Sequence, residues 1–205
     1  MPLWGTTATA ATNKPKFLTN DVNSKYDITK VRATNRGWEQ RAGSSATGCG
    51  NVNAQDEILV AIGGLAGITT STGLKHPTIT RIRWGEAAYV AATAITVLVT
   101  WDEKVMYTAG SAATIVVVST GTNITCTATH FDGVGITNGI KGNTITFTGT
   151  TVDEAATLSI ADDTAIGDPD LFDALGAQDA LASASKTITA AVKTASGYST
   201  RAVTT

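Results

Sequence analysis

The chain has 205 residues and a formal net charge of -2, and only 16% of its residues are charged, against about 25% in an average soluble domain. This charge is too small to steer the protein onto nucleic acid or an anionic membrane, and no apolar run approaches the roughly 20 residues that span a bilayer. Because 42% of the residues are hydrophobic, we expect a soluble protein with a buried core and a surface made largely of threonine, serine, alanine and glycine.

Residues 1–26 show no hydrophobic periodicity and are interpreted as an extended N-terminal arm. The first five residues lack the basic region and apolar run of a secretory signal, so synthesis in a cytoplasm is expected. The arm carries more large apolar side chains than a disordered linker usually does. It either folds back onto its own domain or lies across a neighbouring subunit, with Trp4 and Phe17 as anchors. The candidate partner-contact residues are Leu3, Trp4, Phe17, Leu18 and Tyr26.

Residues 27–92 are predicted to form a β-rich N-terminal region, because short apolar and β-branched runs there are separated by turn signals. Basic residues outnumber acidic ones between Lys14 and Arg41. This excess suggests an acidic partner surface and is too dilute to indicate nucleic-acid binding. The expected elements are a hairpin at residues 28–31 and 36–40, a further strand at 57–62, a strand with one exposed face at 77–84, and a strand or loop at 87–93.

Residues 93–205 are predicted to form an antiparallel β-sandwich with a C-terminal extension. In the clearest strand, Ile124, Cys126 and Ala128 share one face and threonines share the other, which is typical of a half-buried strand. Residues 96–108 are interpreted as a strand followed by a turn. The expected strands are residues 95–101, 114–119, 123–129, 143–148 and 157–160, and the polar faces of the third and fourth carry Thr125, Thr127, Thr129, Thr144, Thr146 and Thr148.

The C-terminal third is less regular. Residues 162–173 include five aspartates, which makes calcium the one metal worth considering, because hard cations take several carboxylate oxygens. The spacing fits no EF-hand, and a solvated acidic loop is the alternative. Residues 170–182 predict a short helix, residues 187–192 a last strand and residues 196–205 a polar tail.

No catalytic site, cofactor or metal centre is predicted. His76 precedes a proline and His130 lies beside a turn, and neither is linked to a nucleophile with an orienting carboxylate. Asp102 and Glu103 are adjacent, so on a strand their side chains point to opposite faces and do not act together on one substrate. Two cysteines are too few for a disulfide scaffold, and we expect free thiols, with Cys126 as a small core residue.

Two resemblances extend this interpretation. Residues 97–105, 124–130, 143–147 and 155–162 resemble bacterial immunoglobulin-like modules of adhesins and surface-layer proteins, which implies an immunoglobulin-like form of the sandwich. The front of the chain is more distinctive. Four segments there, residues 1–5, 15–18, 33–38 and 57–64, resemble the N-terminal halves of virion structural proteins of marine tailed bacteriophages, especially cyanophages. That resemblance implies a multicopy component of a phage particle.

Three functions remain open. The first is a capsid decoration or cement protein that contacts the major capsid protein or other virion subunits, associates with itself, binds neither nucleic acid nor membrane, and resides in the virion after synthesis in the host cytoplasm. The second is a neck or tail component of the same kind of particle. The third is a carbohydrate-binding adhesive module, in which exposed Trp38, Trp84 or Trp101 would stack on sugar rings; the competing interpretation is that these tryptophans are core residues.

Overall fold

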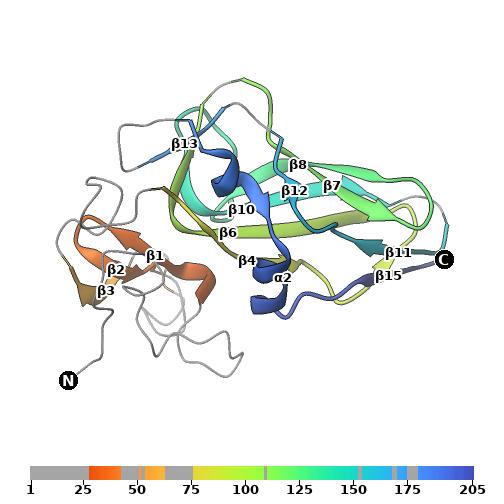
Figure 1. The fold of residues 1–205 in the computed structure, drawn as a ribbon, viewed down its shortest axis with the longest axis horizontal. Coiled ribbons are helices and arrows are strands. Elements are labelled where there is room, and N and C mark those ends of the chain that lie inside the picture. The colour runs from red at the N-terminus through yellow and green to blue at the C-terminus, as the bar shows by residue number, and fades with distance from the viewer. Residues whose placement is uncertain are drawn as a thin grey trace.

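Almost all regular structure in the described part of the chain is β-strand (Figure 1), which confirms the predicted all-β class. The computed structural model describes residues 28–42, 51, 54–62, 76–108, 110–151, 154–167, 170–174 and 180–205. Its strands are β1 Val31–Thr34, β2 Gly37–Gln40, β3 Glu57–Ala61, β4 Ile79–Trp84, β5 Tyr89–Val90, β6 Ala94–Tyr107, β7 Thr114–Ser119, β8 Ile124–Phe131, β9 Val134–Gly135, β10 Lys141–Thr150, β11 Ala156–Ser159, β12 Thr164–Ala165, β13 Leu171–Asp173, β14 Thr187–Ile188 and β15 Arg201–Thr204; the helical segments are η1 Ile28–Lys30, η3 Ser183–Lys186 and α2 Ala190–Ala195.

The large sheet is organised around β6, its longest strand. The strand order is β13, β6, β10, β8, β7, β11, β15, β5, with β4 also paired to β6 and β9 to β8. The turn predicted within residues 96–108 is wrong, because β6 continues to Tyr107. The partner strand changes instead: β4 pairs Ile79 with Trp101, and β13 pairs Asp173 with Val105. One long strand therefore pairs with two different strands, β4 and β13, along the same edge.

Alternating side chains build the apolar core in the way the sequence predicts. On β8, Ile124, Cys126 and Ala128 are buried, while Thr125 and Thr127 are exposed. Cys126 is a free thiol within the core, as expected. Each large aliphatic or aromatic side chain removed from water contributes about 1.5–3 kcal/mol to folding. The largest fully buried side chains are Trp38, Trp101, Phe131, Phe147, Ile82, Ile95, Ile115, Ile145, Leu158 and Ile160.

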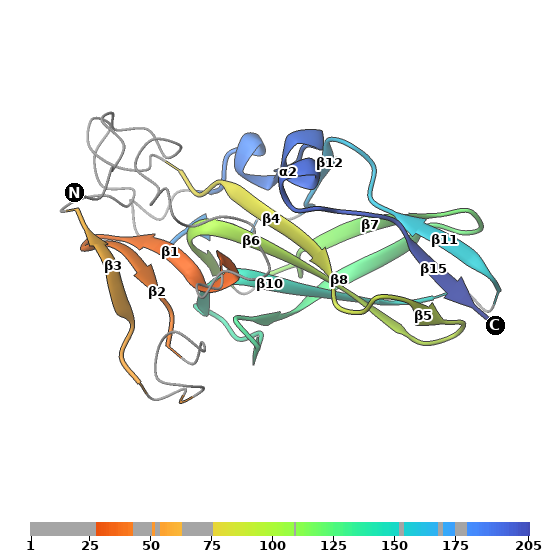
Figure 2. The ribbon, with the colours of Figure 1, turned by 90° about the horizontal axis from the view of Figure 1, so that it is seen from below.

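The large sheet curls over its own apolar face. β7 pairs with β8 from Thr114 to Val117 and then with β11 at Val118 and Ser119, so the sheet bends at β7 and continues through β15 to β5. The helix α2 packs against β4, and the ribbon of β12 and β14 lies beside it (Figure 2). Buried side chains of β4, β6, β7, β8, β10, β11, β14 and β15 belong to one cluster, and the partly buried Val192 of α2 packs against it. The architecture is therefore sandwich-like, and the immunoglobulin-like topology stays a prediction.

Three C-terminal expectations are corrected. In place of a helix beginning at residue 170, Leu171–Asp173 forms β13 and pairs with β6. The predicted last strand at residues 187–192 stops after Ile188, because Thr189 caps the following helix by accepting a hydrogen bond from the backbone N–H of Val192. The polar tail contains a strand, since β15 pairs with β11 and β5. Pairing with strands far away in sequence overrides local propensity in each case.

A separate three-stranded sheet precedes the large one. β1, β2 and β3 form an antiparallel meander, so a hairpin and a next strand are present as predicted. The first strand was misplaced, because residues 28–30 form the 3-10 segment η1 and β1 runs from Val31 to Thr34. Gly37 begins β2 with a φ of +130°, and a Cβ placed there would lie 1.9 Å from the carbonyl oxygen of Val60, so the pairing with β3 requires glycine.

The small sheet lies against one end of the large sheet, where β1 contacts β6, far from the C-terminus (Figures 1 and 2). The two sheets divide between β3 and β4, because β4 and β5 pair within the large sheet. The sequence had placed both of these strands in the N-terminal region, residues 27–92.

Among the described residues, no helix is long and apolar enough to cross a membrane.

Candidate functional site

Charged side chains hold the small sheet against the large one. Arg32 of β1 is buried, and its guanidinium forms ion pairs with Asp56 and, at 3.8 Å, with Asp132. Arg41, just after β2, pairs with the same Asp132. Asp132 lies in the turn between β8 and β9 with a φ of 50°, a left-handed conformation that aspartate tolerates better than most residues. We call Arg32, Arg41, Asp56, Asp132 and Asn143 the polar junction.

Asn143 of β10 connects the backbones of the two sheets. Its side-chain amide donates hydrogen bonds to the carbonyl oxygens of Trp101 at 3.2 Å, Thr29 at 3.4 Å and Val31 at 3.5 Å. Its backbone N–H donates to Asp132 Oδ1 at 3.3 Å. One fully buried amide therefore links β6, β10, η1 and β1.

The junction also explains one error in the expected polar face of β10. Thr144 was assigned to a solvent-facing row of threonines, yet it is 5% exposed. Its hydroxyl donates to the carbonyl oxygen of Thr29 at 3.1 Å and lies 3.1 Å from the hydroxyl of Thr100. The segment η1 covers the outer face of the sheet at this point, which the alternation of one strand does not reveal.

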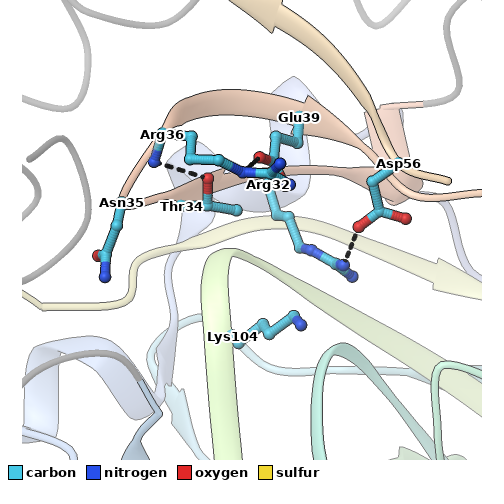
Figure 3. A pocket seen from close by; sticks show the side chains of 7 residues that line it. All are labelled: Arg32, Thr34, Asn35, Arg36, Glu39, Asp56 and Lys104. Carbon is cyan, nitrogen blue, oxygen red and sulfur yellow. Dashed lines mark hydrogen bonds and ion pairs between the residues drawn. The ribbon is translucent and has the colours of Figure 1, made fainter. Parts of the chain in front are cut away.

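A pocket of about 270 Å³ opens beside the junction, between the small sheet and β6. Figure 3 shows Arg32 and Lys104 on opposite walls, with Asp56 beside the Arg32 guanidinium. Above them, Arg36 Nε lies 2.7 Å from Glu39 Oε1 in an ion pair. The lining residues are Arg32, Thr34, Asn35, Arg36, Glu39, Asp56 and Lys104.

The environment disfavours the positive charge on two of these residues. Burial lowers the pKa of Arg32, although Asp56 and Glu39 oppose the shift. Burial also lowers the pKa of Lys104, and the Arg32 guanidinium lowers it further, against the attraction of Asp56 and Glu39. The pocket wall therefore carries cations that have lost part of their hydration.

A second group of titratable residues lies on β6, beside the junction. Glu103 is fully buried, and neither carboxyl oxygen has a hydrogen-bond partner. Burial raises its pKa to about 9, and the charges of Asp102 and Asp173 contribute to the rise. The sequence separated Asp102 from Glu103 onto opposite faces, but both are buried because the small sheet and β13 cover this end of β6. Among the described residues, no group of three metal-ligating side chains forms a metal site.

The five arm residues proposed to contact a partner lie outside the described part of the chain: Leu3, Trp4, Phe17, Leu18 and Tyr26. The three tryptophans considered for sugar stacking are core residues, since Trp38, Trp84 and Trp101 are 1%, 6% and 0% exposed. The hypothesis that they stack on sugar rings is therefore wrong. His76 and His130 are both exposed.

Three aspartates of the acidic loop do not converge on one point. Asp162 pairs with Lys193 at 2.7 Å. Asp170 instead accepts a hydrogen bond from the backbone N–H of Ser111, and Asp173 is buried in β13. These three carboxylates are engaged with different elements, so their gathering in sequence does not predict their placement.

The excess of basic residues before residue 42 also has a structural explanation in the described part of the chain. Arg32, Arg36 and Arg41 each form an ion pair with an acidic residue of the same chain.

Comparison with protein families, curated proteins and solved structures finds no match for this chain. Any function assigned to the chain therefore depends on its own sequence and on the geometry of the junction and the adjoining pocket.

Proposed function

We propose that this chain is a non-enzymatic structural component of a bacteriophage virion, and specifically a capsid decoration protein that stabilises the shell through contacts with other subunits. The resemblance of its N-terminal segments to virion proteins of marine tailed phages supports the assignment of the chain to a phage particle. The polar junction supports a role in which one part of the chain must be held rigidly relative to another.

The observation that carries this proposal is the attachment of η1. Residues 1–26 precede this segment in the chain, and its Thr29 carbonyl accepts hydrogen bonds from Asn143 and Thr144 of the large sheet. The arm therefore starts from a point that is fixed on the sandwich. A partner held by the arm would be held at a defined position relative to the domain, which is what a protein connecting shell subunits requires.

The outer face of the large sheet suits contact with another protein. Thr125 and Thr127 are exposed on β8, and the neighbouring Val116 of β7 is 43% exposed. Short β-branched side chains lose less rotamer entropy on burial than lysine or glutamate do. A partner that covers this face therefore orders its side chains at low entropic cost, and such binding requires no active site.

Copy number in purified particles tests the proposal. A decoration protein should be recovered with empty heads in numbers commensurate with the major capsid protein. A neck or tail component, the alternative within the same particle, would be present in about six or twelve copies. Absence from purified particles would contradict both.

Removal of residues 1–26 tests the arm. We expect the truncated chain to keep its β-sheet circular dichroism and its cooperative unfolding, because the buried cluster of the described chain is built from side chains between Ile79 and Val203. Its occupancy on particles should fall. Unchanged occupancy of a folded, truncated protein would eliminate the arm as the attachment element.

A further inference from the structure

We infer that the pocket between β1 and β6 binds a single carboxylate from an acidic side chain of a neighbouring virion subunit, with Lys104 as the cation that receives it. The chemistry of the ligand is deduced from the pocket itself. The source of the carboxylate rests on the proposed function.

The first argument is the balance of charge in the lining. Three cations, Arg32, Arg36 and Lys104, face two anions, Glu39 and Asp56. Arg36 pairs with Glu39, and Arg32 pairs with Asp56. The side chain of Lys104 makes no hydrogen bond or ion pair with any described residue. One positive charge in the pocket is therefore left without an acidic partner in this part of the chain.

The second argument is an unused donor on a buried cation. Arg32 is 6% exposed, and its Nε has no hydrogen-bond partner. A buried donor of this kind costs about 1–3 kcal/mol when it is left unsatisfied. Figure 3 shows the Arg32 and Lys104 side chains reaching into the same pocket from β1 and β6. An anion between them would give both groups a partner.

The third argument concerns the free-energy cost of keeping Lys104 charged beside Arg32. Desolvation and the Arg32 charge together lower the pKa of Lys104, so its charged form carries a free-energy cost at this position. An anion would offset both effects, and charge-assisted hydrogen bonds are the strong ones. A dianion such as phosphate is disfavoured, because its second charge would face Glu39 and Asp56 with no further cation to balance it.

The chemistry is tested on the whole purified chain, with acetate as the probe and acetamide as the neutral control of similar shape. Nuclear magnetic resonance of isotopically labelled lysine should show a saturable acetate-dependent shift at the Lys104 Cε. The Lys104 titration midpoint should also move to higher pH. Acetamide should cause neither change. Equal responses to acetate and acetamide, or saturation by inorganic phosphate in preference to acetate, would overturn the carboxylate assignment.

Two matched variants test the role of Lys104: Lys104→Gln in the pocket and Arg83→Gln at an exposed position of β4. Lys104→Gln should remain folded, because it removes a partly desolvated charge that has no ion pair. Acetate affinity, followed at the labelled Arg32 side chain, should fall at least about tenfold. Arg83→Gln should bind acetate like the parent. Loss of binding in both variants, or in neither, would contradict the role of Lys104.

Particle association tests the source of the carboxylate. If the parent and Arg83→Gln proteins associate with particles while folded Lys104→Gln associates at least about tenfold more weakly, the neighbouring subunit supplies the anion. Equal association of all three would overturn the inference and leave the structural function intact. Acetate binding by a parent protein that never associates with particles would support the pocket chemistry and reject both the virion partner and the proposed function.

Discussion

The large sheet and the polar junction are held together by different forces. Inside the sheet, apolar side chains from β4, β6, β8, β10 and β11 form one buried cluster. At the junction, Arg32, Arg41, Asp132 and Asn143 join the small sheet to the large one by ion pairs and hydrogen bonds. Burial of apolar area is not directional, whereas these polar contacts depend on position within tenths of an ångström.

This difference has a consequence for stability and for function. A hydrophobic core tolerates changes that conserve volume, and it folds cooperatively. A buried ion pair contributes little net stability, yet removing one partner leaves an uncompensated charge. The sheet therefore supplies the stability of the domain. The junction determines how the N-terminal region is oriented on it.

The largest expected effect lies in the core of the sheet. Trp101 is fully buried, and its indole N–H donates to the carbonyl oxygen of Ser185 at 2.8 Å. We expect Trp101→Ala to lower the free energy of unfolding by about 3–5 kcal/mol in chemical denaturation. Val116→Ala, at a position that is 43% exposed, is the control and should cost less than about 0.5 kcal/mol. Similar losses in both variants would mean that Trp101 does not belong to the cooperative core.

The second effect is a gain in stability, at the point where the two regions meet. The pKa of Glu103 is raised from 4.5 to about 9, so the folded protein keeps a proton that the unfolded chain releases. Stability should fall as pH rises from about 4.5 to about 9, and Glu103→Gln should remove this slope. At pH 7 the variant gains at most about 3 kcal/mol, judged by 1.36 kcal/mol per pKa unit. If the stability of the parent and of Glu103→Gln changed with pH in parallel, the raised pKa would not belong to Glu103.

The third effect tests whether the small sheet can be loosened without loosening the large sheet. Asp132→Asn keeps an acceptor for the backbone N–H groups of Asn143 and Thr144 and removes the charge that faces Arg32 and Arg41. Because the side chains of Asp132 and Arg41 keep partial contact with solvent, we expect a loss of about 1–3 kcal/mol. Amide hydrogen exchange should accelerate in β1 and β2 and change little in β8.

The control for this variant is Asp162→Asn. Asp162 also forms an ion pair, with Lys193, but its side chain is 60% exposed and lies away from the junction. Its replacement should leave exchange in β1 and β2 unchanged. If Asp132→Asn instead accelerates exchange throughout the large sheet, the junction and the core form one cooperative unit, and the distinction between them fails.

The smallest effect concerns polar contacts on the outer face of the sheet. The hydroxyl groups of Thr129 and Thr148 lie 3.0 Å apart across β8 and β10. Thr148→Val keeps the shape and removes this contact, and it should cost less than about 1 kcal/mol in thermal unfolding. Thr125→Val, on the same face of β8, is the matched control. A loss above that of Asp132→Asn would show that this face contributes more than the junction does.

The strand pattern of the chain is largely predictable from the sequence. The order of apolar and threonine residues located β7, β8, β10 and β11, because side chains on a strand alternate with a period of two and one face must be buried. The same reasoning placed Cys126 in the core. It failed for Leu171–Asp173 and for the tail that contains β15, whose short segments become strands only by pairing with distant ones.

The candidate site was not predictable in the same way. Arg32 and Arg41 counted only toward an excess of basic residues, and Asp56 was not singled out. Nothing near Arg32 or Arg41 in sequence indicates Asp132 or Asn143 about a hundred residues later. A charge pair leaves no periodic signal, since its partners can lie anywhere in the chain. Lys104 lies in a segment that was interpreted as a strand followed by a turn, and its place on a pocket wall was not expected.

The sequence by itself determined that this chain forms β-strands with one apolar and one hydroxyl-bearing face, because alternation and hydrophobicity are local properties. Only the tertiary structure decided which hydroxyl faces are covered, which charges meet and where a pocket opens. Those outcomes depend on strand order and on the positions of β1 against β6 and of η1 against β10, which arise from contacts between residues far apart in the chain. Such contacts are set by the free energy of the whole fold rather than by any single segment.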